Sequence, residues 1–97
     1  MPAYVIANVH ITDRPRFMEY SRQVPGTLEP YGGRYVVRGG RVEVLEGEPG
    51  YDRLVVIEFA DAEQARSWYS SEAYDRIKRI RLESADATLA LVEGYSG

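Results

Sequence analysis

Three polar side chains that share apolar strand patterns could transfer protons. His10, the single histidine of the chain, lies in one register of an alternating segment with Asn8. Glu58 interrupts a second apolar segment, in register with Leu54 and Val56. Imidazole and carboxyl groups are common general acids and bases. These patterns predict a catalytic site that needs no cofactor, with His10, Asn8 and Glu58 as its residues.

Each of these residues also has a structural interpretation. His10 can be a partly exposed residue at the end of a strand. Glu58 can form an ion pair across a subunit interface, because a carboxylate in an apolar strand must be paired or have a raised pKa. The expected partner of Glu58 is Arg38 or Arg53.

Arginine and aromatic side chains predict a binding site for a small molecule. Arg38 and Arg53 can hold a carboxylate through two parallel hydrogen bonds. A planar ligand could pack in a pocket between helices and sheet against six aromatic residues, Tyr20, Tyr31, Tyr35, Trp68, Tyr69 and Tyr74, of which the last four are the predicted ligand-binding residues. The alternatives are arginines that prevent edge-to-edge strand pairing and aromatic residues that only form a core.

Composition argues against several classes of partner. The chain has 12 basic and 15 acidic residues and a net charge of −3, so it lacks the basic excess that nucleic acid attracts. It has no cysteine and a single histidine, so we expect no metal site. No secretory or membrane-spanning pattern is present. We therefore expect a cytoplasmic protein without cofactor, nucleic-acid or membrane partners.

Apolar periodicity predicts the elements that must position these residues. Alternation predicts strands at residues 3–11, 34–38, 42–46, 53–60 and 87–92. Helical spacing predicts helices at residues 13–30 and 61–84, with caps at Thr12-Asp13 and Asp61 and a kink or fresh turn at Pro25. A second cap signal at Ser70-Ser71 predicts that the second region divides into two short helices. Gly39-Gly40 is either a hairpin turn or, as we favour, a bulge in one long bent strand, with a reversal at residues 46–50.

The order of elements, βαββαβ, is the ferredoxin-like α+β arrangement, in which both helical regions cover one face of a four-stranded antiparallel sheet. The 97 residues, 1–97, are expected to form a single domain. The other face would then expose Ile6, Leu54 and Val56, a large apolar patch for a monomer. We expect a second copy of the chain to cover it, giving a homodimer through the sheet face.

Several short strings resemble one bacterial family in their order and spacing. They are Tyr31-Gly32-Gly33-Arg34-Tyr35, Arg38-Gly39-Gly40, Glu58-Phe59 and Trp68-Tyr69. The family is the one called domain of unknown function 1330. The resemblance implies a dimeric α+β barrel and brings no established reaction. Two functions stay open: a cofactor-free enzyme for a small anionic or aromatic metabolite, and a non-catalytic binding module.

Overall fold

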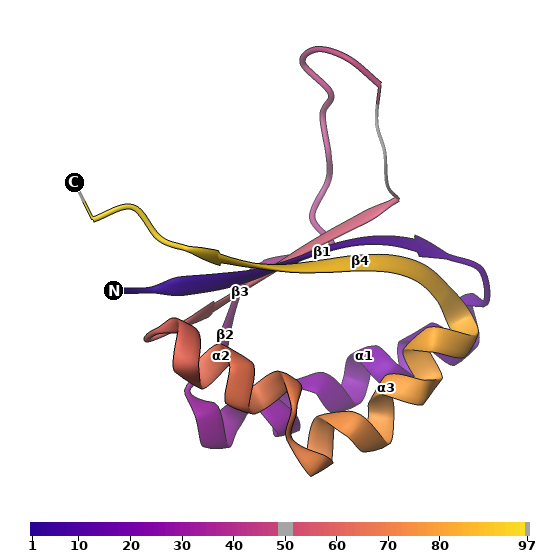
Figure 1. The fold of residues 1–97 in the computed structure, drawn as a ribbon. Helices are drawn as coiled ribbons and strands as arrows, with labels where there is room; N and C mark the ends of the chain where they lie inside the picture. Colours follow the sequence, from indigo (N-terminus) through magenta and orange to yellow (C-terminus); the bar gives the residue numbers. More distant parts are fainter. Residues whose placement is uncertain (49–51, 97) are drawn as a thin grey trace.

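The computed structural model describes residues 1–48 and 52–96 (Figure 1). Its elements are β1 (Ala3–Ile11), α1 (Arg14–Leu28), the 3₁₀ helix η1 (Glu29–Tyr31), β2 (Arg34–Arg38), β3 (Arg53–Phe59), α2 (Ala62–Tyr69), α3 (Glu72–Ser84) and β4 (Ala85–Glu93). Within the described ranges, no helix is long and apolar enough to cross a membrane.

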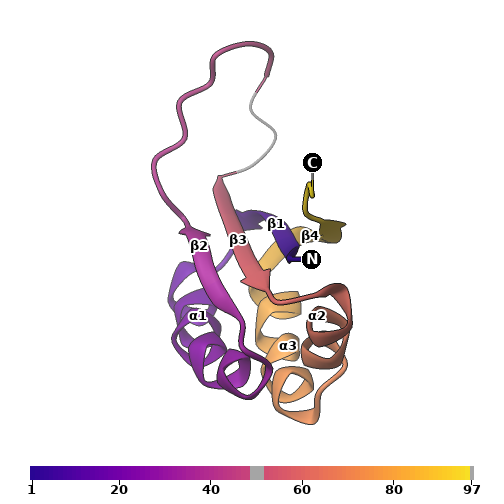
Figure 2. The same ribbon diagram turned by 90° about the vertical axis from the view of Figure 1, so that its left-hand side faces the viewer.

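The four strands form one antiparallel sheet in the order β2-β3-β1-β4. The helices α1, α2 and α3 cover one face of this sheet, and the opposite face stays open (Figures 1 and 2). This is the arrangement that the order of elements predicted, so the predicted fold class is confirmed.

Strand alternation decides which side chains face the helices. Val5, Ala7 and Val9 of β1 are buried beneath the helices. Ile6 lies between them on the open face, where it is half-buried and pairs with Val56 of β3. The sheet therefore has one fully covered apolar face and one partly exposed apolar face.

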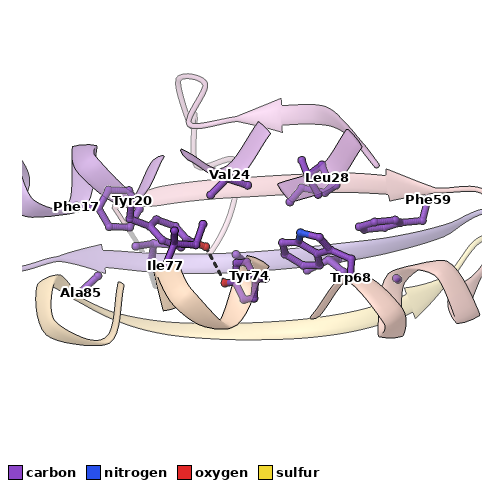
Figure 3. Close-up of a cluster of buried hydrophobic side chains, with 14 residues drawn as sticks. Phe17, Tyr20, Val24, Leu28, Phe59, Trp68, Tyr74, Ile77 and Ala85 are labelled. Atoms are coloured by element: carbon purple, nitrogen blue, oxygen red, sulfur yellow. Dashed lines mark hydrogen bonds between the residues drawn. The ribbon is translucent and has the colours of Figure 1, made fainter. Parts of the chain in front are cut away.

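Aromatic side chains fill the space between the sheet and the helices (Figure 3). Phe59, Trp68 and Tyr74 have almost no exposed surface, and the ring centroids of Trp68 and Tyr74 lie 4.3 Å apart. The indole N–H of Trp68 donates to the Thr27 hydroxyl at 3.0 Å, so its polar atom is satisfied inside the core.

Side-chain caps begin the helices where the sequence predicted them. Asp13, Asp61 and Ser71 each accept a hydrogen bond from the backbone N–H three residues further on, at 2.8–3.2 Å. The Ser71 cap divides the second helical region into α2 and α3, so the predicted pair of short helices is confirmed. α1, in contrast, continues through Pro25, and the fresh turn comes after it, as η1.

The predicted strand at residues 42–46 is wrong. β2 ends at Arg38, and residues 39–48 contain no strand; they project from the sheet on the side opposite the helices (Figures 1 and 2). A strand needs a neighbouring strand to satisfy its backbone N–H and C=O groups. None of the described strands lies beside this segment.

Both interpretations of Gly39-Gly40 are also wrong. Gly39 has a φ of 68°, a left-handed conformation that ends β2 and turns the chain away from the sheet. The irregularity in the ladder between β2 and β3 lies instead between Tyr35 and Val37. The predicted reversal at residues 46–50 lies partly outside the described residues.

Candidate functional site

The three predicted catalytic residues lie on the open face, but Glu58 is far from His10. His10, at the end of β1, contacts the carboxylate of Asp52 at 2.6 Å, and both side chains are more than half exposed. Glu58 pairs across the sheet with Tyr4, six residues before His10. At about 3.3 Å per residue, roughly 20 Å of β1 separates the two positions. A single chain therefore does not bring His10 and Glu58 together.

Glu58 has a partner, but neither of the expected ones. Arg34 of β2 forms the ion pair with Glu58, and the Tyr4 hydroxyl donates to the same carboxylate at 3.2 Å. The expected partners, Arg38 and Arg53, are wrong because strand alternation places both on the helix side of the sheet.

Asn8 lies on the open face between these two ends of β1, opposite Leu54 on one side and Thr88 on the other. Its side-chain oxygen is buried and has no hydrogen-bond donor among the described residues. An amide oxygen in this state lacks the partner that buried polar atoms normally have.

Arg38 and Arg53 come together at one mouth of the space between helices and sheet. Arg38 is opposite Val55 in the β2–β3 ladder, and Arg53 precedes Val55 by two residues on the same face. The Arg38 guanidinium lies over the Tyr35 ring, 4.4 Å from its centroid, and that of Arg53 is 5.7 Å from the centroid of Phe17. Three of the predicted ligand-binding residues, Arg38, Arg53 and Tyr35, therefore form one cluster.

Pro25 provides the anchor for Arg38. Proline has no N–H, so the carbonyl of Ser21, four residues earlier in α1, loses its helical donor. The Arg38 side chain donates to this carbonyl through Nη2 at 2.8 Å. An interruption of the helical hydrogen bonds thus positions a cation at the mouth of the cleft.

The end of β2 fits closely around Arg53. A side chain at Gly39 would collide with the Arg53 guanidinium, whereas one at Gly40 would meet open space. Gly39 also has the positive φ that disfavours other residues. The glycine therefore lets the backbone pass directly beside the cation.

Neither Arg38 nor Arg53 has a carboxylate partner among the described residues. The Nε atom of Arg53 is buried and has no acceptor within residues 1–48 and 52–96. Burial and the nearby Arg38 lower the pKa of Arg53 from its ordinary value. Two close guanidinium groups without a counter-ion make an attractive site for an anion.

A polar chain continues from this mouth into the core. The hydroxyls of Tyr20 and Tyr74 lie 2.8 Å apart, and the Arg81 Nε donates to the Tyr74 hydroxyl at 3.3 Å (Figure 3 shows the tyrosine pair). Arg81 is only 6% exposed and forms no ion pair with a described residue. Burial raises the pKa of Tyr20, so this phenol keeps its proton at neutral pH.

A cavity of about 30 Å³ is lined by Tyr20 and Arg81 of this buried chain and by Tyr35 and Arg53 of the arginine cluster. That volume holds one or two water molecules, or the polar end of a larger molecule. Its polar lining residues are Tyr20, Ser21, Tyr35, Arg53 and Arg81. Donors therefore line both the mouth and the inner end of the cavity.

The other predicted ligand-binding residues divide between core and surface. Trp68 and Tyr74 belong to the buried core, and Trp68 also borders the inner cavity. Tyr69 is 40% exposed and faces a separate open groove of about 320 Å³ beside β4. The structure therefore does not bring Tyr69 to the arginine pair.

Sequence reasoning included Tyr20 among the aromatic residues of a pocket between helices and sheet, and the cavity of about 30 Å³ does contain it, but it missed Arg81 as a site residue. The signal for Arg81 was an arginine in the apolar stripe of α3, which also holds Tyr74, Ile77 and Ser84. A charged residue at a core position of a helix is rarely buried without a partner. Among residues 1–48 and 52–96, no group of three or more His, Asp or Glu residues could hold a metal ion.

Comparisons with known proteins agree with the fold. A family described as "Domain of unknown function (DUF1330)" matches residues 2–95. A structure of the protein RPA0582 of unknown function from Rhodopseudomonas palustris is similar, with a TM-score of 0.81, 16% identity, and coverage of 99% of this chain and 84% of that one. No curated protein matches.

Two further solved structures are similar to this chain, one of a dimeric protein and one of an enzyme. A dimeric ferredoxin-like protein of unknown function from Jannaschia sp. CCS1 has a TM-score of 0.75 and 14% identity, covering 97% of this chain and 100% of that one. SnoaB, a cofactor-independent oxygenase from Streptomyces nogalater, has a TM-score of 0.67 and 10% identity, covering 99% of this chain and 95% of that one. At these identities the likeness shows a shared ferredoxin-like fold.

Proposed function

The chain belongs to the family of domain of unknown function 1330, and from that premise we propose that it is a homodimeric protein that binds a small organic anion. The anion occupies the mouth between helices and sheet, where Arg38 and Arg53 hold its carboxylate and Tyr35 packs beside it. The dimer forms through the open faces of the two sheets. Its cytoplasmic location stays a prediction from the sequence.

The open face supports the dimer. Ile6, Leu54 and Val56 lie there half-buried, and Val92 of β4 is 44% exposed. The segment at residues 39–48 projects on the same side of the sheet (Figure 1). It contains three exposed apolar residues, Val42, Val44 and Leu45. A second sheet packed on this face would remove both from water. The similar protein from Jannaschia is described as dimeric.

One observation carries the binding proposal: Arg53 is partly buried, has a buried Nε without an acceptor, and lies beside Arg38 with no described carboxylate near it. Desolvating a guanidinium is costly unless an acceptor compensates. A ligand carboxylate would supply the missing acceptor and neutralise the two cations. Tyr35 borders the same position, because its ring centroid is 4.4 Å from the Arg38 guanidinium and it lines one cavity with Arg53. Burial raises the pKa of Tyr35, and the two arginines oppose that rise.

Titration calorimetry with benzoate tests the binding proposal. Substituting Arg53→Gln should weaken binding by roughly 10-fold or more, since a hydrogen bond to a charged group contributes about 1.5–3 kcal/mol. Arg22→Gln is the matched control, because Arg22 is exposed on the outer surface of α1 and lines no part of the cluster. Equal affinities for the wild-type protein and Arg53→Gln would refute the proposal.

A second candidate function is cofactor-free turnover of the bound molecule. It is favoured by the similarity to SnoaB, described as a cofactor-independent oxygenase. In this proposal His10, Asn8 and Glu58 remain the predicted proton-transfer residues. Replacing both His10 and Glu58 with alanine should abolish turnover of any substrate found by screening while the dimer persists. Turnover that survives the double substitution would remove this assignment.

A further inference from the structure

Arg81, Tyr74 and Tyr20 form a buried chain of hydrogen bonds beside the cavity that Arg53 also lines. Its three polar groups are linked at 3.3 Å and 2.8 Å, and they lie between α1 and α3, away from the solvent. A buried guanidinium with only a phenol as its side-chain partner has donor capacity left over.

The Arg81 hydrogen bond favours one direction of donation along the chain. The Tyr74 oxygen accepts from the Arg81 cation, and a hydroxyl that accepts from a cation becomes a stronger donor. Either hydroxyl of the Tyr20–Tyr74 pair can donate, and the Arg81 contact favours donation from Tyr74 to Tyr20. In that arrangement the hydroxyl hydrogen of Tyr20 is free to donate, and Tyr20 lines the cavity of about 30 Å³.

The cavity size limits what this donor can meet. It admits a single oxygen-bearing group, and in the absence of a ligand it has room for a water molecule. Arg53 and Tyr35 line the same cavity toward the mouth. A ligand held by its carboxylate at Arg53 can thus place a second oxygen at the inner end.

We propose that the site selects small carboxylic acids that carry a second oxygen, a hydroxyl or a carbonyl, which accepts a hydrogen bond from Tyr20. Arg81 and Tyr74 act as positioning residues that orient the Tyr20 hydroxyl. This inference rests on the proposed function, because it assumes that Arg53 holds the carboxylate. It adds the substrate class: hydroxy and oxo acids rather than simple carboxylic acids.

The test compares matched ligands by titration calorimetry. Benzoate is measured against its 2-, 3- and 4-hydroxy isomers, and propionate against pyruvate. In the wild-type protein, at least one oxygen-bearing ligand should bind about 10-fold more tightly than its parent acid. The quantity compared is the ratio of the two affinities, that of the oxygen-bearing ligand divided by that of its parent acid. In Tyr20→Phe this ratio should fall to about one, even if the affinity for the parent acid also changes.

Two further variants separate recognition from damage to the core. Tyr74→Phe keeps the Tyr20 hydroxyl but cuts its link to Arg81, so the ratio should fall only part of the way. Tyr95→Phe removes a hydroxyl that is 93% exposed and should leave the ratio unchanged. Circular dichroism of each variant reports whether the fold is retained.

The outcomes also separate this inference from the proposed function. Parent acids that bind through Arg53 while no second oxygen improves affinity would overturn the inference and leave the proposed function standing. If the second oxygen still improves affinity in Tyr20→Phe, the inference is likewise overturned and the proposed function stands. Failure of every acid to bind would overturn both.

Discussion

At the scale of single residues, the unusual feature is the set of polar groups that the chain buries without opposite charges. Arg81 lies in the core with a phenol as its side-chain partner, and Arg53 has a buried Nε without an acceptor. Buried charges in proteins are normally paired, because desolvation is expensive. Burial and the neighbouring Arg38 disfavour the Arg53 cation and lower its pKa, and an anion bound at the proposed site would compensate for that cost.

The pH dependence of stability should report the burial of Tyr20. Its folded-state pKa is raised by burial and by Tyr74 and, to a smaller extent, by Tyr35, against the opposing charge of Arg81. Its unfolded-state pKa is near the ordinary value of about 10. The stabilising effect is therefore complete below about pH 10. Above it the unfolded chain binds fewer protons than the folded one, and stability falls as pH rises.

We expect Tyr20 to account for about 1 kcal/mol of lost unfolding free energy at pH 11. Urea unfolding at pH 9, 10 and 11 measures the loss. Between pH 9 and pH 11 the unfolding free energy of Tyr20→Phe should fall by about that amount less than the unfolding free energy of the wild-type protein. The control Tyr95→Phe, at an exposed position, should follow the wild-type curve. Parallel curves for Tyr20→Phe and the wild-type protein would contradict the buried position of this phenol.

At the scale of elements, two interruptions of regular structure position the arginine pair. Pro25 frees the Ser21 carbonyl within α1, and Arg38 of β2 binds to it. Gly39 ends β2 and leaves room for the guanidinium of Arg53. A helix without the proline, or a strand that continued past Arg38, would lose these contacts.

Gly39→Ala should damage both the fold and the site. The added methyl group meets Arg53, and the left-handed backbone costs a residue with a Cβ about 1–2 kcal/mol. We expect the unfolding free energy to fall by about that amount and benzoate affinity to fall several-fold, measured by urea unfolding and calorimetry. Gly40→Ala is the matched control and should change neither. If the two variants behave alike, the close fit around Arg53 is wrong.

At the scale of the whole molecule, a sheet with helices on one side leaves its other face to water (Figure 2). Ile6 of β1 and Val56 of β3 lie opposite each other near the centre of that face. An apolar surface of this kind usually marks an interface. Packing of two such faces would also add stability to a chain of only 97 residues.

Val56→Arg should dissociate the proposed dimer, because the guanidinium would have to be buried without a partner at the centre of the interface. Light scattering at micromolar concentration should report twice the chain mass for the wild-type protein and a single chain for the variant. Ala73→Arg places the same charge on the exposed surface of α3 and should remain dimeric. A wild-type protein with the mass of one chain would refute the dimer.

Local patterns in the sequence determined most of the fold. Alternation identified β1, β2, β3 and β4, and Asp13, Asp61 and Ser71 fixed the beginnings of the helices, because caps and periodicity depend on residues close in the chain. The segment at residues 42–46 also alternates, yet it is not a strand. Strand formation depends on a neighbour, and no local pattern shows whether one is present.

Only the tertiary structure decided which polar residues meet. The sequence predicted Arg38, Arg53 and Tyr35 as ligand-binding residues, but the register between β2 and β3 placed them on the helix side, away from Glu58. Tyr20 and Arg81 are 61 positions apart in sequence and line one cavity because α1 and α3 pack against each other. Such a meeting depends on register and packing between distant segments, which spacing along the chain does not encode.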